Sequence, residues 1–595
     1  MIRKLLGTAL LTGALAMTGS EPSASIGKNI AAQNQLFEQY YEQMLKDSPE
    51  LATTFGDLRY NDLLDDRSLA AIERQHIQRD AFLARLHAIP TQGMPEVDRL
   101  SHAILERNLT NEDTDYDLKS YELPLRTLFG IDTTLADLPQ SVPFDSLKEY
   151  EDYIHRLHQI PRAFDQTIGI LRAGIREGVT QPKIVVSRIQ VRCEGIAAAS
   201  PFLSPTTRYP SAISAADRKK LTEEITKAAN DEVLPAYRRF ATFLKVEYIP
   251  HAQESISIES LPRGKERYAF AVRKLTSLNL SPEQVHELGL REVERINGEI
   301  EDLAHKAGYP SSEKFGASID PAPWQATSAD QVLNDFRKHI AQMQSKLPEL
   351  FTVFPTIPVT VEAAPSYDKS SQTHYLPGTP DGKVPGRVIV QMLDPARGSL
   401  LGDEAVAYHE GIPGHHLQFS IQEQIHGIPK FRLRPSEDEF AFVEGWGLYA
   451  EQLGKEVGFY RDAPSDLSRL ESELFRAVRL VVDTGIHHSG WTREQAIAYM
   501  NKTLGGDDPN DPFVTLEVDR YISWPGQALA YKTGELEILK LREDAKARLG
   551  PNFDLRAFHD EILAAGSLPL DLLDSRIHTW IQTQQTPLTN HKPTN

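Results

Sequence analysis

The sequence predicts a mainly α-helical protein with one small β element. Apolar residues recur at helical spacing along most of the chain, and we find neither a series of alternating strand-like runs nor an internal repeat. Because 595 residues exceed what one hydrophobic core normally supports, we expect two subdomains or one large helical body. A weakly marked boundary near residues 250–270 divides an N-terminal helical region, 26–270, from a second helical region, 271–585.

Residues 1–25 have the features of an export signal. Met1 to Lys4 form a short basic segment, Leu5 to Met17 form an apolar one, and Ser23 to Ser25 offer a cleavage site. We therefore expect a periplasmic or secreted protein, without lipoprotein processing because this segment has no cysteine. An uncleaved N-terminal helix is the alternative. No later run of this sequence reaches the roughly 20 apolar residues of a membrane span.

Helical periodicity marks the main elements in order. The sequence pattern predicts helices over 27–47, 68–90, 144–177, 214–245 and 328–348.

A further helix is predicted to begin after Ser281. Ser281 is a suitable N-cap, Pro282 fits the first helical position, and apolar residues then recur from Val285 to Leu303. At the other end of the chain, we expect residues 586–595 to form a disordered polar tail.

One β-strand is predicted, from Arg387 to Met392, and the glycine- and proline-rich stretch before it, 373–386, is predicted to be a loop. The edge of this strand, around Val390, could bind an extended peptide substrate through backbone hydrogen bonds. A buried structural strand is equally compatible with the pattern.

Charge and cysteine content exclude several classes of function. The net charge of −19 argues against binding to nucleic acid or to an anionic membrane, since both require a basic surface. Cys193 is the sole cysteine, so the chain has no internal disulfide and no thiolate metal cluster. We expect Cys193 to be a structural thiol and not a nucleophile.

Residues 409–416, His-Glu-Gly-Ile-Pro-Gly-His-His, resemble the zinc-binding pattern HExxH but separate the histidines too widely. In an unbroken helix, His415 would be rotated about 120° from His409, and His416 would lie about 10.5 Å away along the axis. Neither pair could share an ion in that geometry.

Pro413 changes this expectation, because proline breaks a helix, and the flanking Gly411 and Gly414 permit unusual backbone conformations. We predict a helix that ends near Glu410, a compact bulge, and a new helix from His415. The bulge would bring the second histidine back beside the first.

The pattern predicts a zinc site of two histidines and one glutamate. The ligands expected are His409, then His416 or alternatively His415, and Glu444, a carboxylate in an apolar segment where an unpaired charge would be costly. We expect Glu451, two helical turns further on, either to hydrogen-bond to a metal ligand or to be solvated. The alternative is a chance His-Glu pair beside histidines that cap a helix.

Three segments, Tyr408–Gln418, Glu444–Trp446 and Pro525–Lys532, resemble the blocks of the bacterial family catalogued as domain of unknown function eight-eight-five. The resemblance extends from about residue 35 to 585. The layout is similar to the helical gluzincin-type zinc peptidases, such as thimet oligopeptidase and angiotensin-converting enzyme. It implies a two-lobed helical body with a deep cleft, although the spacing of the histidines departs from that of those enzymes.

The candidate catalytic groups follow from this chemistry. Glu410 is placed to act as general base toward an attacking water, and His487 or Tyr531 could donate to the developing oxyanion. His and Tyr from downstream segments have these roles in the peptidases it resembles. Arg520 and Lys532 could bind a substrate carboxylate. For each of the last four residues, a purely structural role is the alternative.

Together these observations predict an exported zinc metallohydrolase that cleaves short peptides, as a carboxypeptidase, dipeptidase or oligopeptidase. The expected partner is a peptide or small-molecule substrate, and the oligomeric state stays open. Two other hypotheses are a non-catalytic binding protein of the cell envelope and a zinc hydrolase of ester or non-peptide amide bonds.

Overall fold

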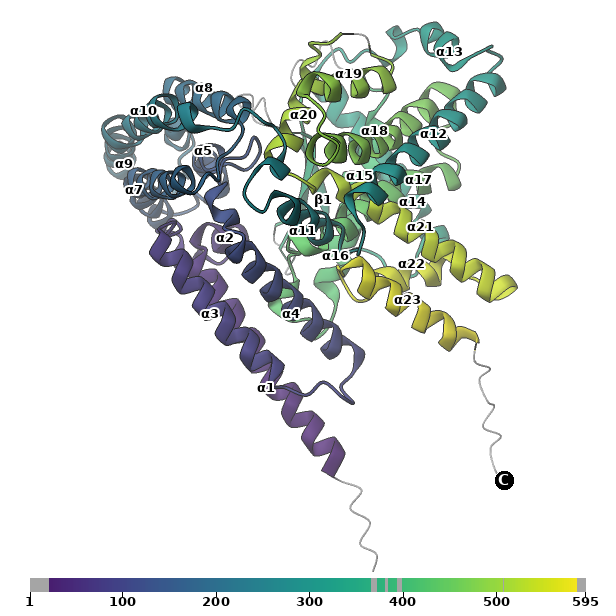
Figure 1. Cartoon of the computed structure of the whole chain (residues 1–595), viewed down its shortest axis with the longest axis horizontal. Helices are drawn as coiled ribbons and strands as arrows, with labels where there is room; N and C mark the ends of the chain where they lie inside the picture. Colours follow the sequence, from purple (N-terminus) through teal and green to yellow (C-terminus); the bar gives the residue numbers. More distant parts are fainter. Residues whose placement is uncertain are drawn as a thin grey trace, which may run out of the picture.

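A computed structural model describes residues 21–364, 372–379, 382, 384–392, 399–506 and 508–585. These residues form a mainly helical protein with a small sheet (Figure 1). Most of the expected export signal, residues 1–20, and the expected tail, residues 586–595, lie outside the described residues. The first helix already begins at Glu21.

The N-terminal half of the chain forms a long arm and a helical bundle. In the arm, α3 packs against both α1 and α4, and the three helices project together from the body in Figure 1. The helices of this half are α1 (Glu21–Asp47), α2 (Pro49–Thr54), α3 (Leu69–His87), α4 (Glu96–Asp117), α5 (Ile131–Ala136), α6 (Leu138–Ser141), α7 (Leu147–Glu177), α8 (Lys183–Ala199), α9 (Ala215–Ala228), α10 (Leu234–Phe243) and α11 (Gly264–Thr276).

The C-terminal half contains the remaining helices and the sheet. Its strands are β1 (Val359–Ala363), β2 (His374–Leu376) and β3 (Gly386–Val390). Its helices are α12 (Pro282–Lys306), α13 (Ser312–Ser318), α14 (Ala329–Leu350), α15 (Asp403–Glu410), α16 (His415–Gln424), α17 (Phe440–Glu456), α18 (Ala463–His487), α19 (Arg493–Thr503), α20 (Pro512–Ser523), α21 (Ala530–Leu549), α22 (Leu555–Leu563) and α23 (Leu570–Gln585).

The predicted helices are confirmed. The stretches 27–47, 68–90, 144–177 and 328–348 correspond to α1, α3, α7 and α14. The stretch 214–245 is α9 and α10, joined by a π-helical turn. Ser281 caps α12 through a reciprocal capping box with Gln284, as its sequence position predicts.

The sheet corrects the prediction for Val390. The strand order is β1–β3–β2, with β1 parallel and β2 antiparallel to β3. The predicted strand is thus the central one, and Val390 is 1% exposed and pairs with Ala363 of β1. An extended peptide cannot add to an edge that is already paired. The predicted loop 373–386 contains the edge strand β2 instead.

The hydrophobic core does not divide at residue 270. One core joins α7, α8 and α10 to α18 and α20, and a second core joins α1 and α4 to α14, α17 and α21–α23. Both the start and the end of the chain therefore contribute to one core, while a C-terminal helix, α18, completes the other. Periodicity identifies the buried face of each helix but not the helix that covers it.

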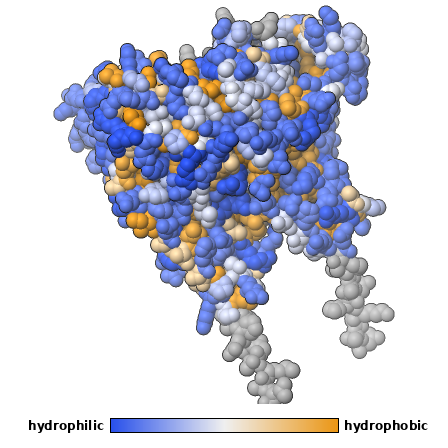
Figure 2. All heavy atoms as spheres, viewed as in Figure 1, coloured by the Kyte–Doolittle hydropathy of each residue, from blue (hydrophilic) through white to orange (hydrophobic). Residues whose placement is uncertain are grey.

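The molecular surface is largely polar. On the face drawn in Figure 2, hydrophobic residues are scattered among hydrophilic ones. Within the described ranges, no helix combines the length and the apolar character needed to cross a membrane.

Two glycines allow α17 and α21 to pack with their backbones in contact. A Cβ atom at Gly534 of α21 would lie 1.8 Å from the carbonyl oxygen of Ala441 in α17. A Cβ atom at Gly445 of α17 would lie 2.4 Å from the Cα of Gly534. Because backbone atoms cannot move aside as flexible side chains do, both positions require glycine. This crossing brings Glu444, beside Gly445, close to the start of α21.

Gly534→Ala should destabilise the protein by about 1–3 kcal/mol, the usual cost of adding a methyl group to a filled site. Gly298→Ala is the matched control: Gly298 is exposed in α12 and nothing lies within 4 Å of its Cβ position. That change should stabilise the protein by about 0.5–1 kcal/mol, because alanine favours helix. Urea unfolding measures both, and equal effects would contradict the backbone contact.

Candidate metal centre

The chain makes a compact turn at the predicted helix break. α15 ends at Glu410 and α16 begins at His415, so the expected bulge and helix restart are confirmed. The N–H of Gly414 donates to the carbonyl oxygen of Tyr408 over 2.9 Å, which folds the turn onto the end of α15. A Cβ atom at Gly414 would lie 1.9 Å from the carbonyl oxygen of His409, so the turn requires glycine there.

Helix α17 holds the turn and the first histidine in place. The indole N–H of the buried Trp446 donates to the carbonyl oxygen of Pro413 over 2.9 Å. Gly447, one residue on, leaves space for the imidazole of His409: a Cβ atom there would lie 2.7 Å from its Nε2. The segment Glu444–Gly447 therefore shapes the site from one side.

Two histidines and one carboxylate converge at this turn. His409 Nε2 lies 3.5 Å from Glu444 Oε2, and His415 Nε2 lies 3.6 Å from the same oxygen. The two imidazole rings are perpendicular, with centroids 4.8 Å apart. His409 and His415 are 3% and 7% exposed, so the two imidazoles are largely shielded from water, while the Glu444 side chain is 21% exposed.

The spacing of these three atoms fits a divalent metal ion. In a tetrahedral zinc site, ligand atoms about 2.0–2.2 Å from the ion lie about 3.3–3.6 Å from one another. Good hydrogen bonds between nitrogen and oxygen are shorter, about 2.7–3.2 Å. Glu410 also offers an oxygen within 4.8 Å of both histidines. Because Glu444 is nearer to both rings, it is the better ligand, and Glu410 remains beside the cluster.

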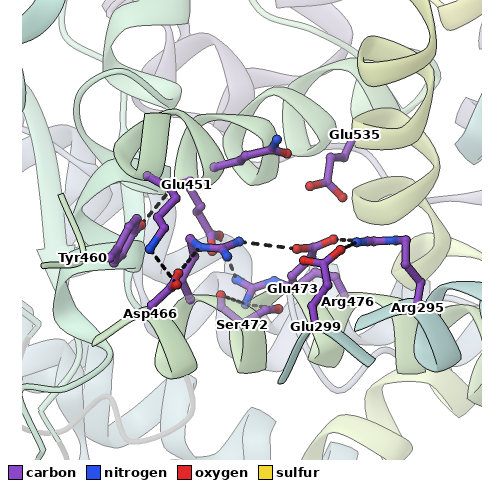
Figure 3. A network of polar contacts seen from close by, with 12 residues as sticks. Arg295, Glu299, Glu451, Tyr460, Asp466, Ser472, Glu473, Arg476 and Glu535 are labelled. Carbon is purple, nitrogen blue, oxygen red and sulfur yellow. Dashed lines mark hydrogen bonds and ion pairs between the residues drawn. The ribbon is translucent and has the colours of Figure 1, made fainter. Parts of the chain in front are cut away.

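Glu451 fixes the orientation of His409. Its Oε1 lies 2.8 Å from His409 Nδ1, and Glu451 is 2% exposed. If Nδ1 carries the proton and donates it to this carboxylate, Nε2 keeps a free lone pair toward Glu444, as metal-binding histidines commonly do. Figure 3 shows Glu451 within a wider set of polar contacts that includes Arg476, whose guanidinium lies 3.9 Å from Glu451 Oε1.

The acids around His409 change its protonation. Burial lowers the pKa of His409, but hydrogen bonds to Glu444 and Glu451 outweigh burial and raise that pKa to about 9. Burial raises the pKa of Glu444, but His409 and His415 hold it well below its usual range. In the metal-free protein, a proton on His409 therefore occupies the place that a cation would take.

Tyr531 and Arg520 lie next to the cluster. The ring of Tyr531 stacks on that of His409 with centroids 6.4 Å apart. Arg520 Nη2 lies 3.4 Å from the Tyr531 hydroxyl oxygen, and the guanidinium carbon of Arg479 lies 4.5 Å from the Tyr531 ring centroid. Two of the predicted catalytic and substrate-binding residues are therefore brought to the site.

His416 is not brought to the cluster. Its Nδ1 lies 3.0 Å from the hydroxyl of Tyr375 in β2, and it is 1% exposed. Burial lowers the pKa of His416 to about 4. Since His415 and His416 are consecutive in α16 and point about 100° apart, only one can face His409. The expectation of His416 as ligand is corrected to His415.

His487 and Lys532 also lie elsewhere. Both ring nitrogens of His487 are bonded to the backbone, Nδ1 to the N–H of Ile258 and Nε2 to the carbonyl of Tyr521, so neither is left for a substrate. Lys532 is 0% exposed, and its ammonium pairs with Glu473 at 2.6 Å and with Glu535 at 2.5 Å. Both residues have structural roles in this arrangement.

Sequence reasoning missed Arg479 and Tyr375. Arg479 lies in an apolar run of α18 and is 2% exposed. An arginine within such a run was the available signal, because a buried charge needs a partner. Tyr375 belongs to a strand of three residues within a loop-like composition, which gives no comparable signal.

Residues 49–577 match the family described as "Bacterial protein of unknown function (DUF885)". No curated protein matches the chain.

Two solved structures are similar over nearly their whole length. The crystal structure of "the putative lipoprotein from Colwellia psychrerythraea" has 26% sequence identity and a TM-score of 0.85, covering 94% of this chain and 99% of that chain. The structure of "a putative lipoprotein of unknown function from Shewanella oneidensis" has 18% sequence identity and a TM-score of 0.69, covering 91% of this chain and 99% of that chain. The second likeness concerns the fold alone.

We expect zinc binding to release close to one proton at pH 7, because the ion must displace the proton of His409, whose pKa is about 9. The apparent zinc affinity should rise with pH by about tenfold per unit until near pH 9. Calorimetry in two buffers of different ionisation enthalpy counts the protons.

Glu451→Gln is the informative variant in the same assay. It removes a carboxylate that raises the pKa of His409, so fewer protons should be released. The affinity should fall by about 10–100-fold through loss of the orienting hydrogen bond. A zinc affinity that does not change between pH 6 and 8 would contradict His409 as a ligand.

Proposed function

The chain belongs to the DUF885 family of bacterial proteins of unknown function, and we propose that it is an exported zinc-dependent hydrolase that cleaves short peptides. One observation carries the proposal: His409, His415 and Glu444 present three ligand atoms at the spacing of a zinc site. Glu410 brings a second carboxylate to within 4.8 Å of both histidines, and we assign it the role of general base.

The ligand set supports zinc and hydrolysis. Two imidazoles and one glutamate form a common catalytic zinc set, and an open fourth position distinguishes catalytic from structural sites. When bound, zinc supplies a Lewis acid that favours attack of water on a carbonyl group.

The chain's own residues supply the proton transfers. Glu410 takes the proton of the attacking water and returns it to the leaving amine. The Tyr531 hydroxyl donates to the carbonyl oxygen as negative charge develops there. Arg479, stacked on the Tyr531 ring, and Arg520, beside its hydroxyl, position this donor.

A helical zinc peptidase of the kind that includes thimet oligopeptidase is the reaction class we propose. What supports it is the arrangement of the groups: imidazoles from two short consecutive helices, a glutamate from a later helix, and a tyrosine further downstream. Cleavage of an amide needs a base that takes a proton from the attacking water and an acid that gives one to the leaving amine. The single carboxylate of Glu410 serves as both in turn.

We also propose a location in the cell envelope. The expected export signal supports it, and both similar solved proteins are described as lipoproteins. Cys193, the sole cysteine, is buried in α8.

Glu410→Gln should lower the turnover of short peptides by at least about 100-fold, since it removes the general base but keeps the shape of the side chain. Zinc content should stay near one ion per chain, as metal analysis checks. Glu313→Gln, a change in the small helix α13, is the control and should have normal activity. Turnover retained by the Glu410 variant would refute this mechanism.

Tyr531→Phe should lower kcat by about 10²–10³-fold with little change in KM, because a donor to the oxyanion acts mainly in the transition state. Tyr309→Phe, which alters a tyrosine packed on the core near α13, should leave both constants unchanged. If Tyr531→Phe raises KM alone, its hydroxyl binds the ground state and the assigned role is wrong.

A further inference from the structure

A cavity of about 480 Å³ lies next to Arg520, and we infer that it binds the C-terminal residue of a peptide substrate, an apolar side chain with a free carboxylate. This inference rests on the proposed function, because it specifies the substrate of the same site. The volume lies within the range of about 300–1,000 Å³ for small-molecule sites.

The cavity is built by both halves of the chain. Its walls come from residues 127–128, from α8 between Ser187 and Arg192, from α20 between Leu516 and Arg520, and from Gln372. It therefore lies between the N-terminal bundle and α20, the helix that carries Arg520.

Several apolar side chains line this space. Leu128, Val191 and Leu516 are among them, and the last two are 62% and 43% exposed. Exposed apolar residues gathered around one cavity favour an apolar ligand.

The charged residues at the cavity have an excess of positive charge. Glu517 pairs with both Arg479 and Arg520, at 3.0 Å and 3.4 Å. Asp519 is likewise shared by two arginines: Arg188 approaches it to 2.6 Å from α8, and Arg493 binds it from α19.

The charge of the fifth arginine, Arg192, is balanced by an acid, because Arg192 pairs with Asp132 at 2.6 Å. Across the ion-pair clusters that include a lining residue, five guanidinium cations, with Arg493 bound to Asp519 from outside the lining, meet three carboxylates, so two cations are in excess. In a chain with a net charge of −19, this is a local reversal of sign that favours an anionic ligand.

Arg520 has a donor that nothing in the described chain uses. The residue is 6% exposed, and its Nε is buried without a hydrogen-bond partner. A second such atom is Nη1 of Arg479, on the other side of Glu517. Both atoms are closed to solvent, so a carboxylate in the cavity reaches Arg520 Nε only when that side chain turns toward it. A carboxylate is the acceptor that guanidinium groups match best.

The position of Arg520 relates the cavity to the reaction. Its Nη2 lies 3.4 Å from the Tyr531 hydroxyl, and Tyr531 stacks on His409. One tyrosine side chain therefore separates a carboxylate at Arg520 from a carbonyl at the cluster. An extended chain spans about 3.5 Å per residue. A peptide bound in this way would be cleaved a few residues from its C-terminus.

The test measures binding to zinc-loaded Glu410→Gln protein, so that no substrate is consumed. The probe is the tetrapeptide Ala-Ala-Ala-Leu with a free carboxylate, compared by calorimetry with the same peptide as its C-terminal amide. We expect the amide to bind at least tenfold more weakly. The peptide ending in lysine should also bind at least tenfold more weakly, because the cavity is apolar and positively charged.

Arg188→Gln, made in the same background, tests the source of the preference. Arg188 is partly exposed, and Asp519 keeps its pair with Arg493, so the fold should tolerate the change. Binding of the free-carboxylate peptide should weaken about tenfold, with the amide little affected. Arg239→Gln, at an exposed position of α10, is the matched control and should change neither. Leu516→Asp, which adds a negative charge to the wall, should weaken the free-carboxylate peptide in the same way.

The outcomes separate this inference from the proposed function. If the amide binds as tightly as the free carboxylate, or if octanoate binds as tightly as the peptide, the inference is overturned, whatever the wild-type turnover. A second outcome is that the carboxylate preference holds and is lost in Arg188→Gln, while the wild-type protein cleaves none of these peptides. That outcome would support the inference about the cavity and refute the proposed peptidase function.

Discussion

The carboxylate of Glu444, held between the imidazoles of His409 and His415, is the interaction on which the site depends. The Glu444 side chain is only partly exposed, so its charge must be compensated, and a protonated His409 or one metal ion can do so. The convergence requires two close backbone approaches, at Gly414 in the turn and at Gly445 and Gly534 in the crossing of α17 and α21. Neither approach leaves room for a β-carbon, so the electrostatics of the centre depend on the packing of the backbone.

Much of the helical framework follows from the sequence, since periodicity and capping residues are local signals. Pro413 and its flanking glycines likewise predict the break between α15 and α16, because the steric rules involved concern neighbouring residues only. The choice between His415 and His416 depends on how α16 is rotated about its axis, and that rotation is set by packing against β2 and α17. Spacing along the chain does not contain that information.

Long-range pairing accounts for the other differences. Lys532 resembles a substrate-binding cation in sequence, but its partners, Glu473 and Glu535, occupy it completely. His487 is similar, since its partners come from segments more than 30 residues away in either direction. The cavity beside Arg520 could not be predicted either, because its walls come from four separated parts of the chain. An excess of arginine over acid appears only once those parts are assembled.

The sharing of cores between the two ends of the chain has a consequence for biosynthesis. Leu36 and Ile104, near the start, pack in the same core as Ile577 and Ile581, near the end. A ribosome adds roughly 5–20 residues per second. The apolar faces of α1 and α4 therefore stay uncovered for on the order of a minute, until the helices that cover them are synthesised. Contacts so distant in sequence also slow folding. The nascent arm should therefore need a chaperone more than its own short-range helical contacts suggest.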